Sequence, residues 1–150
     1  MQTSFIVFFL LAAGVLALFF LLGLMQKILN GNLKKRVAQR FDSKDIIALS
    51  TRANLMGVKS KGSGQVRGNG AMVLTRDTLL FIQAFPKKEF EIPINAIKKI
   101  SLPRAFNGKS VIAKLLCVHY EINGQGESIA WAIKDSHDWK QALETLFTEN

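Results

Sequence analysis

Residues 5–25 read Phe-Ile-Val-Phe-Phe-Leu-Leu-Ala-Ala-Gly-Val-Leu-Ala-Leu-Phe-Phe-Leu-Leu-Gly-Leu-Met, without one charged side chain, Asn, Gln or Pro. As an α-helix this stretch would be roughly 31 Å long, which matches the hydrocarbon thickness of a bilayer. Its five Phe and seven Leu residues each favour insertion near the membrane centre by roughly 0.3 to 0.6 kcal/mol. The stretch therefore predicts a transmembrane helix, and we expect the chain to work at a membrane.

A cleaved signal peptide is the alternative interpretation of the same stretch. Such peptides carry a positive N-terminal region, an apolar run of roughly 7 to 15 residues and small residues at the cleavage site. Here no basic side chain precedes Phe5, and the apolar run is longer before it continues into Gln26 and Lys27. We therefore expect residues 1–25 to be a retained anchor.

The charges that follow the anchor predict its orientation. Residues 26–44 hold one acid, Asp42, and six bases, which are Lys27, Lys34, Lys35, Arg36, Arg40 and Lys44. Basic residues beside a span favour the cytoplasmic side. We expect a single-pass protein of the cell membrane, inner or plasma, with its N-terminus outside and its C-terminal domain in the cytoplasm. Contacts with the membrane surface are expected from Lys27, Lys34, Lys35, Arg36 and Arg40.

Residues 26–44 are interpreted as a basic juxtamembrane linker. Asn30-Gly31-Asn32 predicts a break just below the membrane. Leu33, Val37 and Phe41 then recur at every fourth residue, which indicates a short helix with one apolar stripe.

Composition limits what residues 45–150 can be. About 106 residues are enough for one modest core and no second domain. A single cysteine, Cys117, excludes an intramolecular disulfide and suits a reducing compartment. The net charge of +9 is concentrated in residues 26–44, while residues 45–150 hold fourteen bases against ten acids. The basicity therefore indicates a role beside the bilayer, and no nucleic-acid partner is expected.

The remaining sequence alternates in the manner of β-strands and ends in a helix. Residues 46–58 are ambiguous between strand and helix and are interpreted as a strand. Further strands are expected at 71–75, 79–84, 89–92, 97–102, 111–122 as the longest, and 128–134. From Asp135 onward, apolar residues fall on one stripe of a helix, beginning at Trp139. Trp131 and Trp139 are both expected in the core.

A glycine-rich segment lies between the first two expected strands. Glycines stand at 62, 64, 68 and 70. Their spacing matches neither G-x-G-x-x-G nor G-x-x-x-x-G-K-[ST], and no helix start follows. We therefore expect a flexible hairpin loop whose glycines permit positive φ.

Two quoted stretches carry a family resemblance. Residues 67–81 read Arg-Gly-Asn-Gly-Ala-Met-Val-Leu-Thr-Arg-Asp-Thr-Leu-Leu-Phe, and residues 92–97 read Ile-Pro-Ile-Asn-Ala-Ile. Together with a final helix that contains Asp138-Trp139, this order resembles the pleckstrin-homology-like (PH-like) superfamily, especially its GRAM and bacterial branches. The resemblance covers about residues 45–148. It is carried by Gly70, Leu74, Thr75, Leu80, Phe81, Ile92, Pro93, Ile97 and Trp139.

This resemblance implies a mainly β fold: a bent barrel of about seven antiparallel strands capped by a C-terminal helix. On this one scaffold the superfamily binds phosphoinositides, other lipids, peptides and proteins, so the fold does not identify the ligand. The closely spaced Lys-x-Arg bases typical of phosphoinositide binding are half present, as Lys59, Lys61 and Arg67.

One constellation could suggest an enzyme. Cys117, His119 and Glu121 alternate along one expected strand, as a nucleophile with its base or a set of metal ligands could. The opposite face of that strand is the apolar one, so these three side chains are expected on the outer surface. We expect no catalytic residue, no metal and no cofactor.

The sequence thus predicts a membrane-anchored, non-catalytic binding module for a lipid headgroup or a protein partner. The candidate ligand-binding residues are the bases of the expected loops: Lys59, Lys61, Arg67, Arg104 and Lys109. The alternative is a structural subunit of a membrane assembly, with helix contacts around Ala13 and Ala17.

Overall fold

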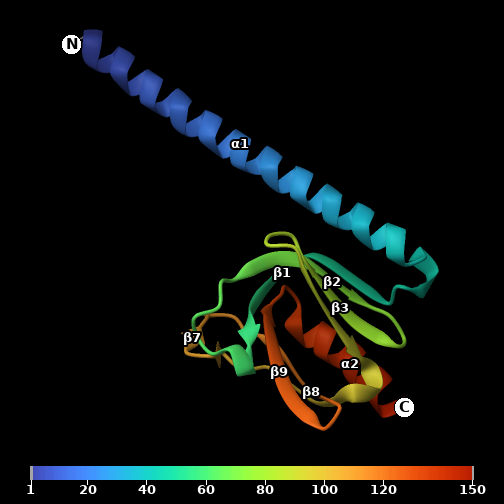
Figure 1. The fold of residues 1–150 in the computed structure, drawn as a ribbon. Coiled ribbons are helices and arrows are strands. Elements are labelled where there is room, and N and C mark those ends of the chain that lie inside the picture. The colour runs from blue at the N-terminus through green and yellow to red at the C-terminus, as the bar shows by residue number, and fades with distance from the viewer. Residues whose placement is uncertain (1, 150) are drawn as a thin grey trace. The chain divides into compact units, whose positions relative to one another are not determined.

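The computed structural model describes residues 2–149, with side chains for residues 6–148. Met1, Asn150 and the side chain of Phe5 lie outside the described residues. The chain divides into two compact units between Asn32 and Leu33. The first unit contains most of helix α1 (Gln2–Arg40), and the second contains the last turns of α1 and everything that follows (Figure 1).

Helix α1 includes a segment that is long and apolar enough to cross a membrane. It falls within Ile6–Arg40, has a mean hydropathy of 2.9, and none of its most apolar window is buried by other described residues. The expected break at Asn30-Gly31-Asn32 is wrong, because the helix continues through all three residues. One glycine inside a helix costs only about 1 kcal/mol relative to alanine, which strong helix formers on both sides offset.

The second unit is built on one antiparallel sheet of seven strands, in the order β4-β3-β2-β1-β9-β8-β5. The sheet is bent and not closed, with β4 and β5 at its edges, and helix α2 (Ser136–Glu149) contacts β5 and β8 (Figure 1). The strands are β1 (Ala48–Val58), β2 (Gly68–Leu74), β3 (Thr78–Gln83), β4 (Lys88–Pro93), β5 (Ile97–Ser101), β8 (Leu116–Ile122) and β9 (Gln125–Ala132). A separate small hairpin joins β6 (Ala105–Phe106) to β7 (Lys109–Ser110), and 3-10 turns cover Ser43–Asp45, Lys59–Lys61 and Ile94–Ala96.

These strands confirm most of the expected ones. The ambiguous residues 46–58 form β1, which at 11 residues is longer than β8. The strand expected from Val111 begins only at Leu116. The preceding residues instead pair back, with the Val111 and Leu115 amides donating to the carbonyls of Arg104 and Pro103.

The concave face of the sheet holds the main core. Trp131 and Phe81 are fully buried there, with ring centroids 5.9 Å apart, and Phe90 packs against Phe81. Trp139 and Leu143 of α2 close the open side of this core. Both tryptophans are core residues as predicted.

The convex face of β2 and β3 is also buried, by the last turns of α1. Leu33 and Val37 pack on Ala71, Val73, Leu80 and Ile82. Strands β2 and β3 therefore have apolar neighbours on both faces, which explains why their sequences are continuous apolar runs without alternation. The boundary expected between residues 44 and 45 falls inside this compact unit, which begins at Leu33.

Ion pairs fix the direction of this helix segment along β4. Arg40 contacts Glu91 at 2.5 Å and Glu89 at 2.7 Å, and Arg36 contacts Glu89 at 3.0 Å. Arg36 also donates to the carbonyl of Gln83 at 3.3 Å. Going back from Arg40 to Leu33 therefore leads toward the β3–β4 turn, so the chain enters the domain at the end of the sheet that carries this turn.

The convex face of β8 and β9 is covered as well, which corrects the prediction for Cys117. Cys117 is buried, not on the surface, among Met56, Leu115 and Ala130. The segment with the β6–β7 hairpin adds Phe106 and Val111 to this cluster. Burial raises the pKa of the Cys117 thiol, so the thiol is held in its neutral form.

Removing a side chain from the α1–sheet contact tests its contribution. Leu33→Ala should lower the free energy of unfolding by about 2 to 5 kcal/mol, because it leaves a cavity over β2 and β3. Lys34→Ala, one residue on and exposed, is the matched control and should change it by less than about 0.5 kcal/mol. Denaturant titration of the full chain in detergent can be followed by the fluorescence of Trp131 and Trp139, its two tryptophans. Equal midpoints for the two variants would contradict the packing role.

Candidate functional site

Two connections meet at one end of the sheet. The register places Leu55 opposite Gly68 and Gly70 opposite Gln83, so the β1–β2 loop (residues 59–67) and the β3–β4 turn (residues 84–87) lie at the same end. A cleft of about 300 Å³ opens between them. Its lining residues are Leu55, Lys61, Gln65, Val66, Gln83, Phe85, Pro86, Lys88 and Phe90.

The rim of this cleft combines cations with exposed apolar tips. Lys61 and Lys88 line the cleft, and no carboxylate does. The side chains of Val66 and Phe85 are 80% and 84% exposed. The cleft thus has basic and apolar side chains on the same rim.

Further bases stand on the same two connections. Lys59 and Arg67 belong to the β1–β2 loop, and Lys87 belongs to the turn, all three exposed. Residues 59–70 and 84–88 contain no acid. The nearest acid in sequence, Glu89, already pairs with Arg36 and Arg40. Glu127 at the start of β9 also reaches the β1–β2 loop, where its carboxylate accepts from the Ser60 amide. Cations nevertheless outnumber acids at this end and give it a net positive potential.

The side chain of Gln65 holds the β1–β2 loop in place. Its carbonyl accepts from the Val58 amide at 2.9 Å, and its amide donates to the carbonyls of Val58 and Gly62, both at 2.7 Å. Gly62 has a φ of 67°, which favours glycine. The loop expected to be flexible is thus tied internally.

A second tie comes from the β6–β7 hairpin. Asn107 donates to the Val58 and Gly62 carbonyls at 2.9 and 3.1 Å, and the Lys109 ammonium donates to the Gln65 carbonyl at 2.6 Å. Lys109, predicted as a ligand-binding residue, therefore has a partner in the loop and stabilises its conformation.

The opposite wall of the cleft depends on Gln83. This buried side chain donates to the Phe85 carbonyl at 3.0 Å, while its backbone carbonyl accepts from Arg36. A Cβ at Gly68 would lie 2.2 Å from the Gln83 amide nitrogen. A side chain at position 68, which lies inside β2 and not in the loop, would therefore displace the Gln83 side chain from this wall.

The structure brings together some of the predicted ligand-binding bases and adds others. Lys61 lines the cleft, Lys59 and Arg67 share its loop, and Arg104 lies on the separate β6–β7 segment. Sequence reasoning missed Lys87, Lys88 and Phe85. The signal was an aromatic residue beside two adjacent lysines in a turn, but only strand register shows that this turn faces the first loop.

His119 has a different setting from the one that a nucleophile or metal site needs. Its Nε2 lies 3.0 Å from the Ser101 hydroxyl, and its Nδ1 lies 2.8 Å from the Ser128 hydroxyl. Cys117 is 3.6 Å away but buried beneath, and Glu121 points to solvent. Among residues 2–149 no three His, Cys, Asp or Glu side chains are grouped to hold a metal ion. The arrangement links β5, β8 and β9 through side-chain hydrogen bonds.

Burial lowers the pKa of His119, and the nearby Lys99 and Lys59 lower it further. On unfolding, the imidazole regains its ordinary pKa of 6.5 and takes up a proton more readily than in the folded state. The His119 contribution to stability is therefore present above about pH 6.5 and is lost as the pH falls below it.

The measurement is the thermal midpoint of the full chain at about pH 7.5 and about pH 5.5. The drop on acidification should be smaller for His119→Gln, which does not titrate, than for the native chain. Matching drops would show that His119 does not carry the pH dependence. His137→Gln, exposed on α2, is the control and should behave as the native chain does.

Comparisons with known proteins bear on the fold. No protein-family model matches this sequence, and no curated protein matches it. Solved structures do. The C-terminal domain of an unknown protein from Leishmania infantum has a TM-score of 0.53 at 13% identity, covering 69% of this chain and 84% of that one. A chain of the 8S snRNP assembly intermediate has a TM-score of 0.52 at 11% identity, covering 72% and 83%.

The Vps36 N-terminal PH domain has a TM-score of 0.51 at 13% identity, covering 69% of this chain and 79% of that domain. At such identities the likeness shows the fold alone. The predicted fold is confirmed: the bent seven-stranded sheet with its C-terminal helix is PH-like. The narrower GRAM and bacterial assignment stays a prediction.

Proposed function

We propose that this chain is a single-pass membrane protein whose PH-like domain binds anionic lipid headgroups at the cytoplasmic surface. The observation that carries the proposal is the cleft between the β1–β2 loop and the β3–β4 turn. It is lined by Lys61 and Lys88 without a carboxylate, and it is flanked by the exposed Val66 and Phe85. The lysines would pair with the phosphate or carboxylate groups of the lipids, and the side chains of Val66 and Phe85 would enter the bilayer interface below those groups.

The way the chain enters the domain supports this proposal. Leu33 lies at the end of the sheet that carries the β3–β4 turn, as the pairing of Arg36 and Arg40 along β4 requires. The residues before Leu33 include the proposed anchor. The cleft therefore opens at the end of the domain where Leu33 lies.

The juxtamembrane bases divide into two groups. Lys27, Lys34 and Lys35 are exposed and are proposed to contact the membrane surface. Arg36 and Arg40 have carboxylate partners on β4, so their first role is to hold the helix to the sheet. Each free lysine near an anionic surface contributes about 1 kcal/mol.

Tethering changes the affinity that such a cleft needs. A short connection to the same membrane gives nearby headgroups an effective concentration in about the millimolar range. Weak, salt-sensitive binding would therefore be enough to hold the domain against the surface.

The test reports the environment of the β1–β2 loop in the full chain. Val66→Cys carries an environment-sensitive fluorophore, since the native Cys117 is buried. The chain is placed in nanodiscs of phosphatidylcholine alone, or with about 30% phosphatidylserine to supply a negative surface. Fluorescence should shift to an apolar environment only with phosphatidylserine, and about 0.5 M salt should reverse the shift.

Two lysine pairs provide the matched comparison. Lys87→Glu/Lys88→Glu reverses the charge of the turn and should abolish the shift, because two reversals remove at least about 2 kcal/mol, or about 30-fold in affinity. Lys98→Glu/Lys99→Glu makes the same charge change on the exposed face of β5 and should leave the shift intact. A shift absent from both kinds of disc, or lost equally in both variants, would refute headgroup binding by the cleft.

A further inference from the structure

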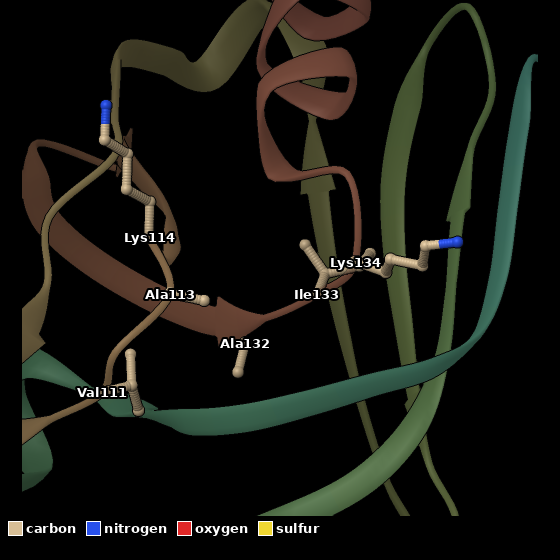
Figure 2. Close-up of a pocket in the computed structure, with 6 residues that line it drawn as sticks. All are labelled: Val111, Ala113, Lys114, Ala132, Ile133 and Lys134. Carbon is tan, nitrogen blue, oxygen red and sulfur yellow. The ribbon is translucent and has the colours of Figure 1, made fainter.

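A second pocket lies where β9 ends. It has a volume of about 300 Å³ and is lined by Val111, Ala113, Lys114, Ala132, Ile133 and Lys134. Figure 2 shows its apolar floor, with Val111 and Ala113 on the segment before β8 and with Ala132 and Ile133 where β9 ends. None of these residues lines the cleft described above.

Different segments form the two sites. The cleft lies between the β1–β2 loop and the β3–β4 turn, whereas this pocket lies between the end of β9 and the segment before β8. The register brings them nearest at Leu55 of the cleft, which pairs with Trp131, the residue before Ala132.

Two cations flank the apolar floor. Lys114 and Lys134 extend to opposite sides of the pocket, and both are exposed (Figure 2). Lys134 has only a long contact with Asp135, at 3.9 Å between two exposed side chains, and among the described residues Lys114 has no ion-pair partner. No carboxylate lines the pocket. A ligand that matches this charge carries two separated negative groups on either side of an apolar one.

The segment beside the pocket is also open to backbone pairing. The amides of Val111 and Leu115 donate to backbone carbonyls, but within the described part of the chain no acceptor is found for the three amides between them. The middle residues are irregular in conformation, and the side chain of Ile112 is 100% exposed. An extended peptide could supply both carbonyl acceptors and an apolar contact here.

We infer that this pocket binds an extended acidic segment of a partner protein. One apolar side chain of that segment fills the floor, and Asp or Glu residues on either side of it pair with Lys114 and Lys134. The volume is at the lower limit of ligand pockets, about 300 Å³, which suits one side chain and not an acyl chain. The inference is independent of headgroup binding, because none of the residues that line this pocket lines the cleft.

The probes are fluorescent seven-residue peptides of the form Gly-Asp-Glu-X-Glu-Asp-Gly, with Leu, Ile, Phe or Trp at the centre. Fluorescence anisotropy is measured with the full chain in nanodiscs of phosphatidylcholine alone. At least one apolar centre should bind, and Gly at the centre should weaken binding about tenfold or more through lost burial. Failure of all four peptides to bind, or equal binding of the Gly peptide, would overturn the inference.

Charge reversal then locates the site. The double variant Lys114→Glu/Lys134→Glu should bind the acidic peptide with an affinity about tenfold or more below that of the native chain. It should instead bind the matching peptide that has Lys in place of Asp and Glu. Lys87→Glu/Lys88→Glu, at the cleft, is the matched control and should keep the native preference. Unchanged tryptophan fluorescence would establish that both variants are folded. Equal losses of peptide affinity in the two variants would show nonspecific attraction to a basic protein and would overturn the assignment. The assignment would also be overturned if Lys114→Glu/Lys134→Glu abolished the lipid-dependent fluorescence shift of the label at position 66 but left peptide affinity unchanged.

Discussion

The packing of Leu33 and Val37 on the convex face of β2 and β3 is the contact on which the rest of the domain depends. It covers the apolar side chains of Ala71, Val73, Leu80 and Ile82, which would otherwise form an exposed apolar face. The same contact makes the end of α1 an integral part of the PH-like unit. A segment whose composition is that of a basic linker therefore contributes to the core, and the position of the chain entry follows from it.

The sequence predicted elements whose signals are local. Strands β3 and β4 are marked by turns and by the inward alternation of Phe90 and Ile92, and α2 is marked by its apolar stripe. The sequence also predicts the apolar stripe of Leu33 and Val37, but it does not predict the surface that this stripe covers. That surface is formed by strands about 35 to 50 residues later in the chain, so no local pattern identifies it.

The same limit explains the errors at the candidate site. Cys117 has polar neighbours at alternate positions and was assigned to the surface, because nothing local shows that the β6–β7 segment folds over it. The basic β1–β2 loop was predicted, whereas Lys87 and Lys88 became part of the site only through the register of β2, β3 and β4. The hydrogen bond from the Lys109 ammonium to the Gln65 carbonyl could not be predicted from local sequence either, since it joins residues 44 positions apart.

The two edge strands of the open sheet also bear on association between copies of the chain. An unpaired edge is a template for strand addition from another chain. Here β4 carries Glu89 and Glu91 with arginines bound to them, and β5 exposes Lys98 and Lys99. Pairing of two β4 edges or of two β5 edges would bring like charges together, and pairing of β4 with β5 would make the lysines compete with Arg36 and Arg40 for Glu89 and Glu91. The charged edges therefore act against the addition of a further strand.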